Sequence, residues 1–145
     1  MANHYRSIVV AVDGSKEAEY AFRKSIDVAK RNKNSLLTIV NVINSCSFEA
    51  SDRSSVDRAQ QRSEELLNGY KAQADAEGIK NADVVIEYGS PKTKITKELA
   101  NLVEADLIIC GATGLNAIEL FLLGSVSEAI VRTAKCDVLV IRTPE

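Results

Sequence analysis

The residues best placed to do chemistry in this chain are three glycines and a serine that follow an apolar run. Gly111 comes directly after the run, Gly114 stands three positions on, and Gly124 and Ser125 follow after nine more residues. Because glycine has no Cβ, the backbone can approach an anion closely. Successive N–H groups at a turn and at a helix start can then point at the negative charge. The spacing predicts a phosphate cradle, which indicates a class of ligand more than a reaction.

A second candidate, Asp13, ends an apolar run near the start of the chain. Its carboxylate could accept hydrogen bonds from ribose hydroxyls, or help to hold a magnesium ion beside phosphates. It could equally be a turn residue at a strand end, or the N-cap of the following helix. From the residue alone both readings stay open. The glycines could likewise be ordinary turn residues, but Ser125 and the preceding apolar run favour ligand binding.

Five short apolar runs, rich in Val and Ile, must position these residues. The runs are mostly continuous rather than alternating, which is typical of parallel strands buried on both faces. We expect strands over 7–12, 36–42, 83–87, 106–110 and 137–141.

Helical patterns separate the runs. The first helix has Ser15 as its N-cap and an apolar stripe at helical spacing. The second is expected to start with a capping box at Ser54 and to end before Gly78, with a very polar first half. The members of the first stripe are Ala18, Ala21, Phe22, Ser25, Ile26 and Ala29.

Two further helices are expected in the second half of the chain. The third has Ser90 as its cap and Pro91 at its first position. In the fourth region, either one helix runs through Gly124 or a loop gives way to a helix at Gly124 and Ser125. We favour the second, because Ser125 can cap the new helix. The third helix is expected to turn four residues inward: Ile95, Leu99, Leu102 and Val103.

The alternation of strands and helices predicts an α/β fold, a doubly wound five-stranded parallel sheet with helices on both faces. Strand orders 2-1-3-4-5 and 3-2-1-4-5 both suit five strands. In the second order the first and fourth strands are neighbours, and the winding reverses between them. Asp13 and Gly111 would then meet at the switch point, where ligands bind in such folds. A length of 145 residues predicts a single domain, 1–145.

Three segments resemble the universal stress protein family, and the resemblance covers essentially the whole chain. They are residues 9–15, the element Gly-x2-Gly-x9-Gly-Ser that begins at Gly111, and residues 134–141. The glycine element is similar to that of the ATP-binding branch. The resemblance implies an adenine nucleotide alpha-hydrolase-like domain of order 3-2-1-4-5, an adenine nucleotide at the switch point, and a homodimer formed through the last strand.

The resemblance also implies roles for individual residues. Asp13 would contact ribose or phosphates bridged by Mg²⁺ or Mn²⁺, and so would hold the metal indirectly. Ala11 and Val12 would line the adenine edge, and Val42 would offer backbone groups to the ring. Gly111 and Gly114 would admit ribose and phosphate. The phosphates would be held by N–H and hydroxyl groups of Gly124, Ser125, Val126 and Ser127.

This chain departs from the family pattern in two places. Asn41 stands where family members commonly carry histidine. The segment between Gly114 and Gly124 has Glu119 as its only charge, whereas many relatives have a basic residue there. Triphosphate charge would therefore rest on backbone dipoles and a metal, which leaves the choice among ATP, ADP and AMP open.

Composition narrows the classes of function. The formal net charge is −2 and basic residues do not cluster beyond 30–33, which argues against nucleic acid as the partner. No apolar run reaches the roughly 18 residues that a membrane span needs. Three cysteines without C-x-x-C spacing and one histidine argue for reduced thiols and against zinc. We expect a cytoplasmic protein with neither a membrane nor a nucleic acid as partner.

Three functions are to be compared. The first, which the resemblance implies, is a stress-response regulator that binds ATP. The second is a slow ATP hydrolase or a protein that phosphorylates its own Ser125 or Ser127, although the sequence offers no Walker lysine and no histidine near the site. The third is a receiver-like phosphoacceptor domain, which the residues at the ends of the third and fifth strands disfavour. A flavin site would lack the usual aromatic residues.

The last strand, 137–142, would lie at a sheet edge that invites pairing with a second chain.

Overall fold

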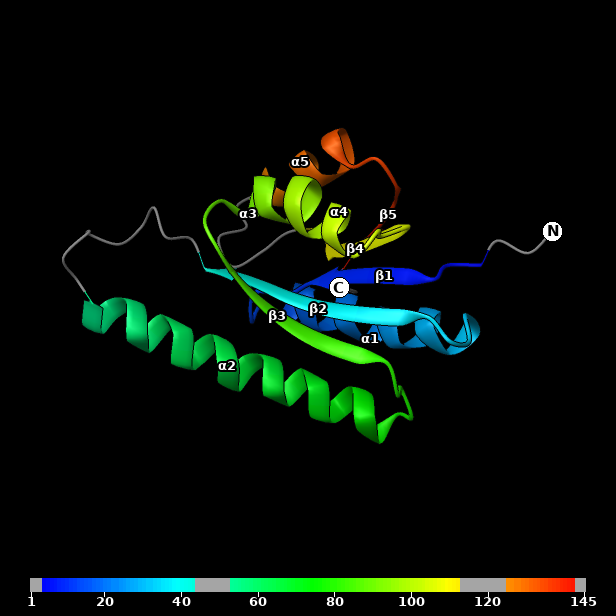
Figure 1. Cartoon of the computed structure of the whole chain (residues 1–145), viewed down its shortest axis with the longest axis horizontal. Coiled ribbons are helices and arrows are strands. Elements are labelled where there is room, and N and C mark those ends of the chain that lie inside the picture. Colours follow the sequence, from blue (N-terminus) through cyan, green and yellow to red (C-terminus); the bar gives the residue numbers. More distant parts are fainter. Residues whose placement is uncertain (1–3, 44–52, 113–124, 143–145) are drawn as a thin grey trace.

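The computed structural model describes residues 4–43, 53–112 and 125–142 (Figure 1). Its sheet is all-parallel, in the order β3-β2-β1-β4-β5. This confirms the doubly wound fold and selects one of the two strand orders that the pattern allowed. Every strand boundary lies within one residue of its prediction. The strands are β1 (Ser7–Ala11), β2 (Leu36–Ile43), β3 (Ala82–Tyr88), β4 (Leu107–Gly111) and β5 (Asp137–Ile141).

Helices cover both faces of the sheet (Figure 1). On one face α1 packs against β1 and β4, while α2 packs against β2 and β3. Residues of η2, α4 and α5 form a second core on the other face. None of the helices in the described ranges is long and apolar enough to cross a membrane. The helical segments are α1 (Lys16–Arg31), α2 (Arg53–Ala76), α3 (Pro91–Thr93), the π-helix η2 (Lys94–Leu99), α4 (Ala100–Leu102) and α5 (Ser125–Thr133).

Helix α1 follows its predicted pattern. The Ser15 hydroxyl accepts a hydrogen bond from the Ala18 N–H at 3.1 Å, so Ser15 is the N-cap. All six residues of the expected stripe are buried. Acidic residues lie in the first turn and basic residues in the last, which suits the helix dipole. The cap and the stripe together fix where α1 starts and which side faces the sheet.

Helix α2 differs from prediction at its start. It begins at Arg53, so Ser54 lies inside the helix and the predicted capping box is wrong. The helix ends at Ala76, before Gly78, as predicted. Its apolar anchor is in the second half, where Tyr70 stacks on Phe22 of α1 with ring centroids 4.6 Å apart. The first half presents mostly exposed polar residues.

The third helical region contains a π-helical stretch that the sequence did not reveal. Pro91 occupies the first position as predicted, but Ser90 makes no side-chain cap hydrogen bond. The Ala100 N–H bonds to the Ile95 carbonyl, five residues back. A π turn takes up one residue more than an α turn, so later residues rotate away from their expected face. Leu102, predicted to face inward, is 78% exposed.

The remaining predictions for this stripe hold. Ile95 and Leu99 are buried, and Val103 is half-buried against the same core. Leu102 is therefore the one residue of the expected stripe whose predicted burial is wrong.

Candidate functional site

The predicted site residues that the structure describes lie at the carboxyl edge of the sheet. Asp13 follows β1, Val42 is near the end of β2, and Gly111 ends β4. The Ser127 hydroxyl donates a hydrogen bond to the Gly111 carbonyl, which holds the first turn of α5 against β4. Gly114, Gly124 and the side chain of Ser125 lie outside the described residues. Helix α5 does begin at Ser125, in agreement with the favoured alternative for this region.

Three of the candidates form an apolar group on the α5 face of the sheet. Ala11, Val42 and Val126 are each half-buried and pack against the core that α5 shares with η2. They come from the ends of β1 and β2 and from the first turn of α5. Half-buried apolar side chains beside polar strand ends suit a ligand that has a flat apolar ring.

Val12 is bound into the sheet. Its side chain is buried in the core on the opposite face, with α1 and α2. Its N–H donates to the Val40 carbonyl at 2.9 Å, and its carbonyl accepts from Asn41 Nδ2 at 2.8 Å. The role of Val12 in the structure is support of the strand end, and its contact with adenine stays a prediction.

Asp13 is exposed at the edge. Its Oδ1 accepts a hydrogen bond from the Ser15 N–H at 2.9 Å, so the turn role that the sequence allowed is present. Gly14, the next residue, has φ +85°, a conformation that residues with a side chain rarely adopt. The turn leaves the Asp13 carboxylate at the rim, and its proposed ribose or metal contact stays a prediction.

Gly111 has a packing role that sequence reasoning missed. A Cβ at this position would lie 3.0 Å from the Glu17 carbonyl oxygen and 3.1 Å from its carbon. The absent side chain therefore lets the first turn of α1 approach β4 closely. The space that a Gly111 side chain would occupy is filled by α1. The predicted role of Gly111 in admitting ribose and phosphate stays a prediction.

Ser127 and Cys110 are neighbours beneath the first turn of α5. Both are buried, and the Ser127 hydroxyl is engaged with the Gly111 carbonyl. Burial raises the pKa of the Cys110 thiol to about 11, although a hydrogen bond with Ser127 lowers it in part. Cys110 is therefore a neutral thiol at physiological pH, and a poor nucleophile.

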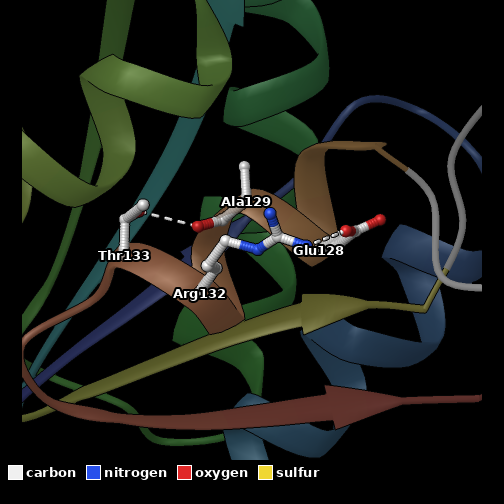
Figure 2. A network of polar contacts seen from close by, with 4 residues as sticks. All are labelled: Glu128, Ala129, Arg132 and Thr133. Atoms are coloured by element: carbon white, nitrogen blue, oxygen red, sulfur yellow. Dashed lines mark hydrogen bonds and ion pairs between the residues drawn. The ribbon is translucent and has the colours of Figure 1, made fainter.

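Contacts along the exposed face of α5 support the helix (Figure 2). Arg132 Nη2 lies 2.5 Å from Glu128 Oε1, and the Thr133 hydroxyl donates to the Ala129 carbonyl at 2.7 Å. Glu128 is in the first turn and Arg132 in the last, the favourable orientation relative to the dipole. These contacts stabilise the helix whose first turn is bonded to the end of β4.

Two residues outside the predicted set bind the strand ends together. Asn41 joins β2 to the Val12 carbonyl, and the Ser63 hydroxyl of α2 donates to Asn41 Oδ1 at 2.7 Å. Asn41 was noticed in the sequence only as a departure from the family pattern. Ser63 carried no signal, because it lies in the polar part of α2.

An open hollow of about 650 Å³ lies at the opposite edge of the sheet, between the last turn of α1 and the start of β5. Val28, Leu107 and Leu139 line it. Its position at the amino ends of β4 and β5 separates it from the candidate site. In the described ranges, no three His, Cys, Asp or Glu residues come together as a metal site would require.

The sheet order defines a doubly wound α/β domain, with Asp13 after β1 and Gly111 at the end of β4 on the two sides of its switch point. A model of the universal stress protein family matches residues 4–142. A putative universal stress protein of Staphylococcus saprophyticus is 55% identical over 144 residues, covering 97% of this chain and 86% of the relative. The chain belongs to the universal stress protein family.

Solved structures share the fold. The universal stress protein UspA of Lactobacillus plantarum superposes with a TM-score of 0.87 at 28% identity, covering 97% of this chain and 100% of its own. A universal stress protein in complex with cAMP superposes with a TM-score of 0.75 at 27% identity, covering 98% of this chain and 100% of its own.

Proposed function

We propose that this protein binds an adenine nucleotide at the carboxyl edge between β1 and β4. It would act as a stress-response regulator according to whether the nucleotide is bound. The observation that carries the proposal is the placement of α5. Its first turn is fixed to the end of β4 by Ser127, beside the edge where Asp13 and Val42 lie. The first N–H groups of a helix lack partners within the helix and attract anions.

The site's chemistry divides into two parts. Ala11, Val42 and Val126 offer an apolar surface for adenine, and the start of α5 offers N–H groups for phosphate. Asp13, exposed after β1, is suited to ribose hydroxyls. A divalent cation, Mg²⁺ or Mn²⁺, would be held by the nucleotide's own phosphates with Asp13 as the protein's contribution. The related structure with cAMP supports adenine nucleotides as the ligand class.

A regulator is favoured over a phosphotransfer enzyme. The Ser127 hydroxyl is buried and donates to a carbonyl, so it is poorly placed to accept a phosphoryl group. The nearby thiol of Cys110 is neutral. Slow ATP hydrolysis remains the alternative, and a single-turnover assay with labelled ATP distinguishes it from binding alone.

Isothermal titration with ATP, AMP and cAMP, each with Mg²⁺, tests the proposal. Asp13→Ala should weaken binding about tenfold, whereas Asp27→Ala, at an exposed position on α1, should leave it unchanged. Val126→Asp should also weaken binding, because it replaces an apolar contact of the site with a charge that repels phosphate. A folded wild-type protein that gives no heat with any of the three nucleotides would contradict the proposal.

A further inference from the structure

Asn41 lies behind the proposed nucleotide site, on the face of the sheet that α2 covers. Successive side chains of a strand point to opposite faces, and its neighbours Val40 and Val42 pack in the α5-side core. Asn41 Nδ2 donates to the Val12 carbonyl at 2.8 Å, and Oδ1 accepts from the Ser63 hydroxyl at 2.7 Å. A carbonyl oxygen only accepts hydrogen bonds, so the Asn41 side-chain nitrogen must face Val12 and the side-chain oxygen must face Ser63.

The Val12 carbonyl belongs to the peptide that joins Val12 to Asp13. The Val12 N–H is bonded to Val40 of β2, so β2 holds this residue by both of its backbone groups. The plane of the next peptide is thereby fixed. Asp13 begins its turn from that plane and accepts the Ser15 N–H. Asn41 therefore acts on Asp13 through one peptide, with no contact of its own to the α5 face.

Helix α2 contacts the same turn at a second point. Ser63 is 3% exposed, and Leu66, almost one turn further on, borders Gly14: a Cβ on Gly14 would lie 3.9 Å from a Leu66 methyl carbon. Ser63 thus fixes the amide of Asn41, while Leu66 packs over the turn that follows Asp13. The position of α2 and the conformation of residues 12–15 are linked.

We propose that Asn41 is a positioning residue for the nucleotide, with Ser63 as the group that orients it. This proposal rests on the proposed function. It links the placement of α2 to nucleotide affinity: a change that separates Ser63 from Asn41 frees the Val12–Asp13 peptide and weakens binding.

The chain offers a matched control. The Tyr88 hydroxyl donates to Gln60 Oε1 at 2.6 Å, which attaches α2 to the end of β3 without touching Val12. Tyr88→Phe removes one side-chain hydrogen bond of α2, as Ser63→Ala does, yet leaves the Asn41 amide in place. Ser63→Thr keeps the hydroxyl and should restore the orientation.

Two readouts on the full chain test the proposal: the AMP dissociation constant, and hydrogen exchange of the Ser15 amide without nucleotide. Asn41→Asp replaces the donor to Val12 with an oxygen, and should raise the dissociation constant at least tenfold. Ser63→Ala should raise it about threefold to tenfold, and Ser63→Thr and Tyr88→Phe less than twofold. Ser15 exchange should accelerate only in Asn41→Asp and Ser63→Ala.

The outcomes separate the two proposals. Wild-type affinity and unchanged Ser15 exchange in folded Asn41→Asp and Ser63→Ala would overturn the positioning role and leave nucleotide binding intact. An equal loss of affinity in Tyr88→Phe would also overturn it, because the effect would then be a general loosening of α2. If the wild-type protein bound no nucleotide, the proposed function would fail, and Ser15 exchange would still decide whether Asn41 holds the turn.

Discussion

The missing side chain of Gly111 sets how closely α1 approaches β4. Gly111→Ala places a Cβ 3.0 Å from the Glu17 carbonyl oxygen, so backbone must move to accommodate it. We expect the free energy of unfolding to fall by about 1–3 kcal/mol, the usual cost of overpacking a core. Urea unfolding followed by circular dichroism measures the change.

Gly69 supplies the control for this substitution. It lies in α2, and a Cβ there would meet nothing within 4 Å. Gly69→Ala should stabilise the protein by about 0.5–1 kcal/mol, because alanine loses less entropy in a helix. Two glycine-to-alanine changes with effects of the same sign and size would contradict a packing role for Gly111.

The buried thiol of Cys110 makes the free energy of unfolding depend on pH in the alkaline range. Its pKa is raised from 9.0 to about 11 in the folded protein. Between these values the unfolded chain loses the proton while the folded chain keeps it, so stability falls as pH rises. The free energy of unfolding should drop by up to about 1.4 kcal/mol per pH unit in this window.

Cys110→Ala isolates this contribution from those of other titrating groups. Under reducing conditions, unfolding at pH 8.5 and 10.5 should show a smaller alkaline loss in the variant than in the wild type. Parallel losses in the two proteins would mean that the Cys110 thiol ionises in the folded state as readily as in the unfolded one.

Single residues were predictable from sequence where a local rule governs them. Ser15 is identifiable as a cap because a hydroxyl before a helix has one favourable use, and the turn role of Asp13 follows from its place at a strand end, while its ligand contact stays a prediction. The contact of Gly111 with Glu17 joins residues distant in sequence, so the glycine's spacing could not reveal it. The same holds for Ser63, whose partner Asn41 lies on another element.

At the scale of the element, the π turn of η2 decides which face of the third helical region is buried. Leu99 is 1% exposed and Leu102 is 78% exposed. Leu99→Ala should cost about 2–5 kcal/mol of stability, whereas Leu102→Ser should change it by no more than about 0.5 kcal/mol. Thermal unfolding distinguishes the two variants, and a large loss from Leu102→Ser would place Leu102 in a buried contact.

The sequence predicted strands better than helices for a physical reason. A parallel strand covered on both faces is a continuous apolar run, so its ends coincide with the ends of the run. The helical pattern assumes an unbroken period of 3.6 residues, which the π turn interrupts. The polar start of α2 has no apolar stripe to mark it, and the helix extends one residue beyond the expected cap.

At the scale of the whole molecule, β5 lies at the edge of the sheet. Within the described residues it pairs with β4 alone, and its Val138, Leu139, Val140 and Ile141 are half-buried. We expect a homodimer through this edge, since an apolar strand with one unpaired edge favours pairing with a strand of another chain.

Val140→Lys tests the dimer, because a charged side chain at an edge disfavours strand pairing. Size-exclusion chromatography with light scattering should report a dimer for the wild type and a monomer for the variant. A monomeric wild type, or a variant that remains dimeric, would show that this strand is not the interface.

Helix α2 is held unevenly along its length. Its second half is anchored in the core by Leu67, Tyr70 and Ala74, whereas Gln60 and Ser63 contact the strand ends through single hydrogen bonds. The first half of α2 therefore depends more on polar contacts than the second half does. A partner that bound the exposed first half of α2 could shift Ser63 relative to Asn41, and so report on, or alter, the conformation of the sheet edge beneath it.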